Sequence, residues 1–309
     1  MTICALSSAP GSSGVAVIRI SGPETKNLIK KLIKKELPRP RMATLLKLYN
    51  INTSSLIDEA IVLWFPGPNS YTGEDMAELH VHGSRAIITC LQNTILETQK
   101  CRLAEPGEFT KLAFINGKIN LLKAEAIGDL IAAETQIQID QAQSIIKGKS
   151  FLKFEKIREN LIKILATLEA KIDFPEEDIP ENVTKNIKKD LEKIEEDIKK
   201  ILDDNKVGEK IRTGFKVAIV GPPNSGKSSL MNYFSKREVS IVSEIAGTTR
   251  DVLETHLNFD GYPVIISDTA GIRESKDIIE KEGIKLAFKK ADEADLRIVI
   301  IEPKNVEFF

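Results

Sequence analysis

The sequence predicts an α/β protein of several domains, and three observations lead to this prediction. The chain has 309 residues, more than one typical domain, and 42% of them are apolar, enough for more than one core. Short β-type runs alternate with helical stretches in the first part, and the middle part is helical. In the last part a glycine-rich loop stands between a strand and a helix. We therefore expect three domains, with the bounds 1–117, 118–212 and 213–309.

The first region, 1–117, mixes both kinds of element. Turns such as "PGPNSYTG" and "EPGEF" separate them, because glycine and proline interrupt regular structure. The expected strands are 14–20, 59–65 and 76–82, and the expected helices are 24–35 and 84–98. This pattern predicts a compact α/β domain.

The second region, 118–212, has apolar residues at helical spacing and predicts three helices. Their ranges are 120–143, 151–174 (ended by Pro175) and 183–202. The third helix carries one apolar seam between Glu and Lys residues: Ile187, Leu191, Ile194, Ile198 and Ile201. We expect this helix to pack on its neighbours, and a coiled-coil partner is the alternative.

The third region, 213–309, opens with a phosphate-binding motif. A predicted strand at 215–220 leads into Gly221–Ser228, which fits G-x-x-x-x-G-K-S, and a helix at 226–236 follows. Gly226 would let the backbone approach phosphates, whose charge the N–H groups and the helix N-terminus bind. Lys227 would reach the terminal phosphates, and the Ser228 hydroxyl would coordinate magnesium.

Two further motifs support a nucleotide site. "SDTAG" ends another predicted strand at 262–267, where Asp268 would hold magnesium through water and the Gly271 amide would meet the γ-phosphate. Between this motif and the loop lies "IAGTTRD", whose Thr248 and Thr249 are candidates for a switch loop. This order of motifs is that of a small GTPase domain.

The group that positions the attacking water is left open by these residues. Ile272 follows D-T-A-G, where Ras-type enzymes have a glutamine, and an alkyl side chain cannot orient water. Nearby carboxylates are the alternatives: Glu274, Asp277, Glu280 and Glu282. Arg250 and Arg273 are close in sequence, but neither is required as an arginine finger.

Composition excludes other classes of protein. The net charge of −1 argues against a DNA-coating protein, although a local basic patch could still bind RNA. The chain has no run of about 18 apolar residues and no basic segment before an apolar one at its start. We therefore expect a cytoplasmic protein that does not enter membranes.

The cysteines and histidines are expected to be structural. Cys4, Cys90 and Cys101 lack the spacing of a metal site or a disulfide framework and are predicted to be free, buried thiols. His80 and His82 share one face of a strand without further ligands, so we expect no metal there. His256 lies in a strand near a hairpin.

Several motifs resemble the MnmE (TrmE) family of bacterial tRNA modification GTPases along essentially the whole chain. They are "VIRISGP", "PGPNSYTGEDMAELHVHG", "AEPGEFTKLAFINGKINLLKAEAIGDLI" and "IDFPEEDI", together with the GTPase motifs. The resemblance implies an N-terminal, folate-binding domain like those of aminomethyltransferases, which forms a homodimer. It also implies a central helical domain into which the P-loop GTPase domain is inserted.

The resemblance further implies an activity. Members hydrolyse GTP with Mg²⁺ and K⁺, and act on tRNA with the flavoenzyme MnmG in a heterotetramer. The product carries a carboxymethylaminomethyl-type group at C5 of the wobble uridine, and the folate is 5-formyl- or methylene-tetrahydrofolate.

Residues that match the family's motifs receive roles by this resemblance. Arg19, Glu78 and Lys118 match the folate contacts. The catalytic residues would be Glu280, which matches the glutamate that helps to orient water, and Thr249, which would cap the magnesium and the γ-phosphate. The potassium ligands would be Asn224, Ser243, Ile245 and Thr248, and the magnesium ligands Ser228 and Thr249. The GTP-binding positions would be Asn224, Ser225, Gly226, Lys227, Ser228, Ser229, Ser243, Glu244, Ile245, Ala246, Gly247, Thr248, Thr249, Asp268, Thr269, Ala270 and Gly271.

The sequence also departs from the family. It contains neither N-K-x-D, which reads guanine, nor the C-terminal C-x-G-K motif, and it is expected to be a truncated member. We expect an unpaired sheet edge, weak nucleotide affinity and poor base discrimination. The alternative function is a non-catalytic, folate-binding dimerisation fragment. A ribosome-assembly GTPase is disfavoured, because no RNA-binding KH module with a G-x-x-G loop is found.

Overall fold

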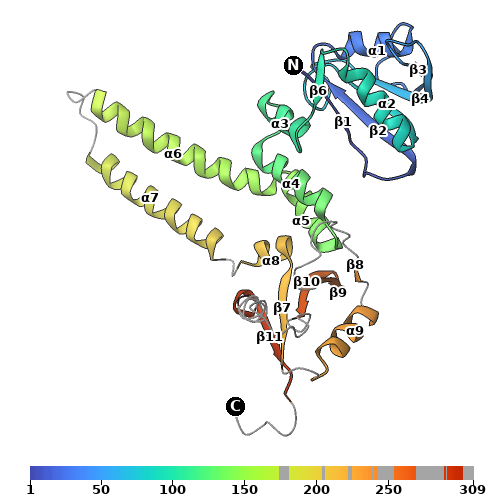
Figure 1. Ribbon diagram of the computed structural model, residues 1–309. Coiled ribbons are helices and arrows are strands. Elements are labelled where there is room, and N and C mark those ends of the chain that lie inside the picture. Colours follow the sequence, from blue (N-terminus) through green and yellow to red (C-terminus); the bar gives the residue numbers. More distant parts are fainter. Residues whose placement is uncertain are drawn as a thin grey trace, which may run out of the picture. The chain divides into compact units, whose positions relative to one another are not determined.

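The computed structural model (Figure 1) describes residues 1–173, 181–203, 206–221, 225–237, 240–241, 254–268, 289 and 291–301. It divides into two compact units, Met1–Ala124 and Glu125–Phe309. Within the described ranges, no helix is both long enough and apolar enough to cross a lipid bilayer.

The first unit is built on a six-stranded sheet with the order β3-β4-β5-β2-β1-β6. The strands are β1 (Thr2–Leu6), β2 (Ser13–Ser21), β3 (Thr44–Tyr49), β4 (Leu56–Phe65), β5 (Met76–Gly83) and β6 (Cys101–Leu103). Only β1 and β6 pair in parallel, and the other neighbours are antiparallel. The strands predicted at 14–20, 59–65 and 76–82 are confirmed as β2, β4 and β5.

Helices cover one face of this sheet. They are α1 (Thr25–Ile33) and α2 (Arg85–Leu96), which confirm the two predicted helices, and a third helix, α3 (Glu108–Ile115), follows β6. Leu28, Leu32 and Leu91 of the covering helices are fully buried against strand residues such as Ile18 and Leu79. This contact forms the core of the unit.

The prediction of three free thiols is confirmed, but the prediction that all three are buried is wrong for Cys90. Cys4 and Cys101 are buried in strands β1 and β6. Cys90 is exposed, because it lies on the face of α2 opposite the buried residues Ile88 and Leu91.

The opposite face of the sheet carries polar side chains together with exposed apolar ones, among them Val15, Leu45 and Ile61. Successive side chains of a strand point to opposite faces, so the neighbours of the buried Ile18 and Leu79 must point away from the helices. Arg19 and Glu78 are such neighbours, and they are register partners on β2 and β5. The alternation of β2 and β5 therefore places a cation beside a carboxylate on the face opposite α1 and α2.

The helical part of the second unit differs from one prediction. A single helix was expected over 120–143, but α4 (Leu121–Ala132) ends and α5 (Gln136–Ile146) begins after a short break. Thr135 and Gln138 form a capping box, in which each side chain bonds the other's backbone N–H. These bonds satisfy donors at a helix start, so the chain turns where apolar periodicity alone suggests continuity.

Helices α6 (Lys149–Asp173) and α7 (Glu181–Leu202) confirm the other two predicted helices, and α8 (Val207–Thr213) follows. Ile187 and Ile194 of α7 are buried with Ile164 of α6, so the prediction that α7 packs on a neighbour is confirmed. Leu191 of the same seam is 42% exposed.

The rest of the second unit is a five-stranded sheet with the order β11-β7-β10-β9-β8. Its elements are β7 (Phe215–Val220), helix α9 (Lys227–Arg237), β8 (Ser240–Ile241), β9 (Glu254–Phe259), β10 (Tyr262–Asp268) and β11 (Leu296–Val299). β7 is parallel to both β10 and β11. The strands predicted at 215–220 and 262–267, and the helix after the loop, are confirmed.

Strand β11 is an edge of this sheet, since among the described residues it pairs with β7 alone. Leu296 and Val299 are more than half exposed on it. The unpaired, apolar edge expected from the sequence is found in this part of the chain.

The second unit joins its helices to its sheet through polar and apolar contacts. His256 Nδ1 on β9 lies 3.0 Å from the Glu134 carboxylate before α5, and Arg212 Nε of α8 donates to Asp129 of α4 at 2.7 Å. The turn at Gly261, between β9 and β10, packs against Ile137 of α5. The β9–β10 hairpin is thereby docked on the start of α5.

Candidate functional sites

The first candidate site lies where β7 passes into α9. β7 is the strand between β10 and β11, so its carboxyl end lies between the carboxyl ends of these two parallel strands. Ligands of open α/β sheets bind at this edge, outside the carboxyl ends of parallel strands. β7 precedes the glycine-rich loop and α9 follows it, as the sequence predicted.

Three residues of the loop have the properties of an anion-binding site. Gly226 has a φ of +95°, a conformation that residues with a side chain rarely adopt, and no atom of the described residues lies within 4 Å of the position a Cβ would take. The Ser225 hydroxyl oxygen is buried and has no hydrogen-bond partner within the described part of the chain. Lys227 is 4% exposed, and its Nζ donates to the Gly221 carbonyl at 2.8 Å. A buried cation and an orphaned hydroxyl beside an open glycine fit a bound phosphate.

The backbone of Asp268 ends β10 at the same sheet edge. It is the register partner of Ile219, two residues before Gly221. The two motifs, 47 positions apart in the numbering of the sequence, therefore end on adjacent parallel strands. The Ser229 side chain, in the first turn of α9, is exposed.

Most of the other predicted nucleotide residues lie outside the described residues. They are Asn224, Ser243, Glu244, Ile245, Ala246, Gly247, Thr248, Thr249, Thr269, Ala270, Gly271 and Glu280, together with the alternatives Glu274, Asp277 and Glu282. Their roles stay predictions, as do the side-chain roles of Ser228 and Asp268.

The second candidate site lies in the first unit, on the sheet face opposite α1 and α2. Nε and Nη2 of Arg19 donate to Oε1 of Glu78 at 3.0 and 2.8 Å. The guanidinium also lies over the rings of Tyr71 and Phe109, 5.8 and 5.5 Å from their centroids. Both ionic side chains are partly buried, with 28% and 16% exposed. The arrangement holds a planar cation within cation–π distance of two aromatic rings.

Lys118, which follows α3, lies against Gly73 of the loop between β4 and β5. Its Cε would lie 3.1 Å from a Cβ on Gly73, and the lysine itself is exposed. Asn116 donates to the Thr72 carbonyl at 2.7 Å. The structure thus brings Arg19 and Glu78 into direct contact and sets Lys118 against the loop that carries Tyr71.

The sequence prediction missed the aromatic residues of this site. Tyr71 and Phe109 stand in "NSYTG" and "GEFTK", next to turns. An aromatic side chain beside a surface turn could have marked these loops as candidates for a binding site. The Tyr71 hydroxyl lies 2.9 Å from that of Thr110 on α3. Helix α3 therefore positions both Phe109 and Tyr71 around Arg19.

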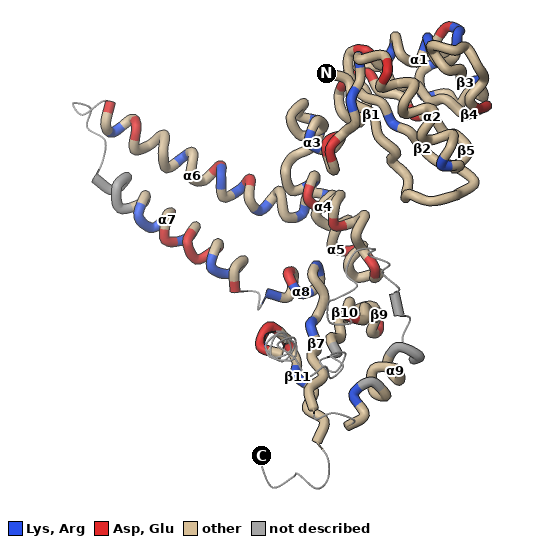
Figure 2. Tube along the Cα trace, in the orientation of Figure 1, with Lys and Arg blue, Asp and Glu red and all other residues tan. Residues whose placement is uncertain are grey.

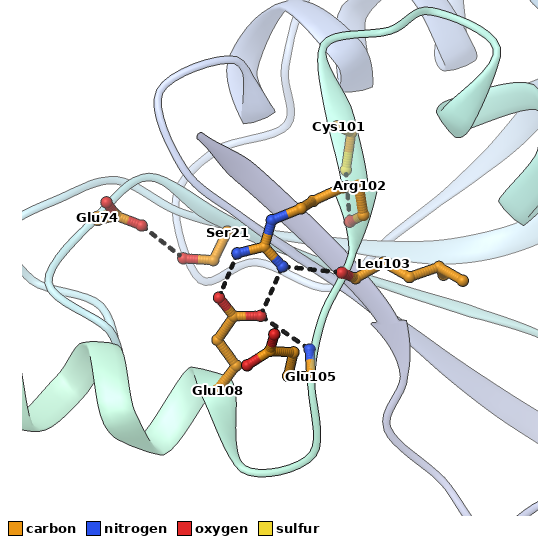
Figure 3. Close-up of polar contacts among 7 residues, drawn as sticks. All are labelled: Ser21, Glu74, Cys101, Arg102, Leu103, Glu105 and Glu108. Atoms are coloured by element: carbon orange, nitrogen blue, oxygen red, sulfur yellow. Dashed lines mark hydrogen bonds and ion pairs between the residues drawn. The ribbon is translucent and has the colours of Figure 1, made fainter.

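An ionic cluster fixes the start of α3 (Figure 3). Arg102 of β6 donates to both carboxylate oxygens of Glu108, at 2.8 and 2.5 Å, and the Glu105 backbone N–H donates to Glu108 at 2.8 Å. The bonds from Arg102 are the main cause that lowers the pKa of Glu108 to about 2. On the other side of Figure 3, Ser21 donates to Glu74 at 3.3 Å.

The two strand histidines have separate carboxylate partners. His80 Nε2 lies 3.4 Å from Glu78, and His82 Nδ1 lies 2.8 Å from Asp58. Burial alone would raise the pKa of Asp58, but hydrogen bonds from the His82 backbone N–H and imidazole hold that pKa below its usual range. These contacts give both histidines a structural role.

Family models match nearly the whole chain. A model described as "GTP-binding protein TrmE N-terminus" matches residues 2–118, and one described as "MnmE helical domain" matches residues 121–304. The second match spans both the helices and the sheet of the second unit.

Similar proteins carry one name. A protein of Pelagibacter ubique named "tRNA modification GTPase MnmE" is 64% identical over 308 residues, which cover all of this chain and 70% of that protein. Proteins of the same name from Rickettsia akari and Rickettsia bellii are 48% identical over 307 residues, 99% of this chain and 69% of theirs.

Proposed function

Because the chain belongs to the MnmE family of tRNA modification GTPases, we propose that it binds GTP at the loop between β7 and α9 and hydrolyses it in the service of tRNA modification. The product would be a wobble uridine with a carboxymethylaminomethyl-type group at C5. The flavoenzyme MnmG would be its partner, and the chain would act as a homodimer.

The observation that carries this proposal is the loop itself. Gly226 leaves open space above the loop, while the buried Ser225 hydroxyl and the Lys227 amine stand beside it. The loop amides and the N-terminus of α9 would bind the phosphates. Lys227 would leave the Gly221 carbonyl for the terminal phosphates, a partner that carries a full charge.

The proposed metal ions would be held by oxygen donors. Ser228 and Thr249 would bind Mg²⁺, while Asn224, Ser243, Ile245 and Thr248 would bind K⁺. Hard cations prefer oxygen ligands, and both ions would supply positive charge against the phosphates during hydrolysis. Glu280 would orient the attacking water.

The second site is proposed to bind a tetrahydrofolate. The Arg19 guanidinium is paired with Glu78 and lies over the rings of Tyr71 and Phe109, so the site offers flat, aromatic and cationic groups. These groups suit a pterin ring and its glutamate carboxylates. Lys118, which is exposed, would supply a further cation for a carboxylate.

The proposed domain division supports this separation of roles. Residues 1–117 would carry the folate site, 118–212 the helices and 213–309 the nucleotide site. The proposed folate residues belong to the first compact unit, and the proposed nucleotide residues belong to the second.

A nucleotide titration tests the first proposal. Fluorescent GDP is titrated into the full chain in potassium buffer with magnesium and is then displaced with GTP or ATP. The variant Lys227→Met removes the amine but keeps an apolar stem, and we expect its affinity to fall at least tenfold, since a charge-assisted bond is worth about 1.5–3 kcal/mol. The matched control is Lys189→Met, at an exposed lysine of α7.

Displacement by GTP but not ATP, lost in Lys227→Met alone, supports the proposal. Absence of binding, or equal displacement by ATP, contradicts it and favours the folate-binding fragment as the function of this chain. Folate binding is measured separately by calorimetry with 5-formyltetrahydrofolate. Arg19→Gln should weaken it, while Arg85→Gln, at an exposed residue of α2, should not.

A further inference from the structure

A concentration of positive charge in the described part of the chain lies on and after α1 (Figure 2). We name it the α1 basic surface, and it consists of Lys26, Lys30, Lys31, Lys34, Lys35 and Arg39. Between residues 24 and 39 only Glu24 and Glu36 carry negative charge, so this segment has a net charge of +4 in a chain of net charge −1.

The fold directs these charges outward. Four apolar residues of α1 are buried in the core of the first unit: Leu28, Ile29, Leu32 and Ile33. Lys26, Lys31 and Lys35 are exposed, and Lys30 is half-buried. Because one half of the helix is fixed in the core, the cations are presented from a rigid base.

The acidic partners on this surface are few. Lys30 pairs with Glu36 at 2.6 Å, and Lys34 lies over the Tyr49 ring at 4.8 Å from its centroid. Glu24 accepts a hydrogen bond from Asn27 at 3.2 Å. Two carboxylates at the ends of the segment leave most of its positive charge uncompensated.

Helix α7 shows that lysine content alone does not produce such a surface. It has six lysines and six acidic residues over Glu181–Leu202. Its lysines pair along the helix, as in Lys188–Glu192, Lys199–Glu195 and Lys200–Asp197. The charges of α7 therefore cancel locally, which is the usual pattern of a solvated helix.

We propose that the α1 basic surface binds the phosphate backbone of RNA. A rigid, uncompensated set of lysines with few aromatic residues fits sequence-independent phosphate contacts. An anionic membrane is disfavoured, since the apolar side chains of α1 point into the core and none remains on this face to enter a bilayer. That the RNA is tRNA rests on the proposed function, whereas the phosphate contact does not.

The test measures how salt weakens RNA binding. Fluorescently labelled tRNA is titrated with the full chain, without nucleotide, at several KCl concentrations between about 50 and 200 mM. The variant Lys26→Gln/Lys31→Gln/Lys35→Gln removes three charges of the surface. The matched control, Lys188→Gln/Lys189→Gln/Lys200→Gln, removes three from α7.

We expect the slope of log affinity against log salt to fall by about 2–3 in the α1 variant and to stay unchanged in the α7 variant. An unrelated RNA hairpin should lose affinity to the same extent as tRNA. Circular dichroism must show that both variants are folded; the altered side chains are exposed, so folding should be retained.

Equal slopes for the wild type and the α1 variant overturn the proposal, as does an equal loss in both variants. So does binding to phosphatidylserine vesicles that depends on the α1 lysines when RNA binding does not. Failure of GTP to displace fluorescent GDP would contradict the proposed function, yet it would leave this nucleotide-free RNA measurement unaffected.

Discussion

Replacing Glu108 by glutamine should destabilise the first unit in a way that depends on pH. The carboxylate accepts bonds from Arg102 and from the Glu105 backbone, and its pKa is lowered to about 2, chiefly by Arg102. A pKa of about 4.3 in the unfolded chain and about 2 in the folded chain corresponds to about 3 kcal/mol. The Arg102 side chain is 41% exposed, so solvent screening reduces this to about 1–2 kcal/mol.

The sign of the pH dependence follows from the direction of the pKa change. A lowered pKa in the folded state means that the contribution is complete above about pH 4.3 and is lost as the pH falls toward 2. The difference in stability between wild type and Glu108→Gln should therefore be largest near pH 7. By about pH 3 more than half of it should be gone.

The chain offers a selective probe for this measurement. Trp64 is the only tryptophan, and it is 5% exposed in the core of the first unit. Its fluorescence during urea denaturation therefore reports the unfolding of this unit. The matched control is Glu105→Gln, which removes the same charge near Arg102 without removing a bond to its guanidinium.

A constant difference between wild type and Glu108→Gln at pH 7 and pH 3 would refute the reasoning, because the loss would then be unrelated to ionisation. An equal effect in Glu105→Gln would also refute it. If the reasoning holds, folate affinity should fall with Glu108→Gln as well, because α3 carries Phe109 and bonds Tyr71.

Three further predictions concern packing and backbone. Gly22→Ala should lower the free energy of unfolding by more than about 2 kcal/mol, because φ is +134° and a Cβ would lie 2.5 Å from the Thr2 backbone. Gly128→Ala, inside α4 with open space around the added Cβ, should instead raise it by about 0.5–1 kcal/mol. Urea denaturation checks both variants, and a change of the same sign in both would contradict the argument. Ile194→Ala, at a residue that is 6% exposed, should lower the free energy of unfolding by about 2–4 kcal/mol, and Leu191→Ala, at a residue that is 42% exposed, should lower it clearly less. Thermal unfolding followed by circular dichroism checks this, and an equal loss of stability in the two variants would disprove it. Thr135→Ala should cost about 1 kcal/mol by removing the cap of α5, with Thr135→Ser as the conservative control that keeps it.

Elements with local sequence signals could be predicted, whereas the pairing of strands distant in the sequence could not. The loop before α9 could be predicted because strand, loop and helix are consecutive in the chain. The break before α5 also had a local signal, since Thr135 and Gln138 have the spacing of a capping box. Strand β6 has three residues, too few for periodicity to reveal it.

The candidate sites show the same limit. Arg19 and Glu78 are 59 positions apart, and β2 pairs with β5 rather than with the next strand along the chain. Nothing in the residues themselves specifies that register, so their ion pair could not be foreseen. The resemblance named both residues, and the structure adds that they contact each other.

The docking of the β9–β10 hairpin on α5 has a mechanical consequence. In the sequence, Ser243–Thr249 precede β9 and Thr269–Gly271 follow β10, so the two segments predicted to sense the γ-phosphate are joined to the two ends of one hairpin. In the described part of the chain, the hairpin is held by β7 and β8 at its two sides, by the contact of His256 with Glu134, and by the turn against Ile137. The two strands are paired along their length, and the turn between them rests on α5, so a displacement of the hairpin would act on that helix. A movement of the predicted switch segments would therefore be passed through the hairpin to α5, and from there to the helical part of the chain.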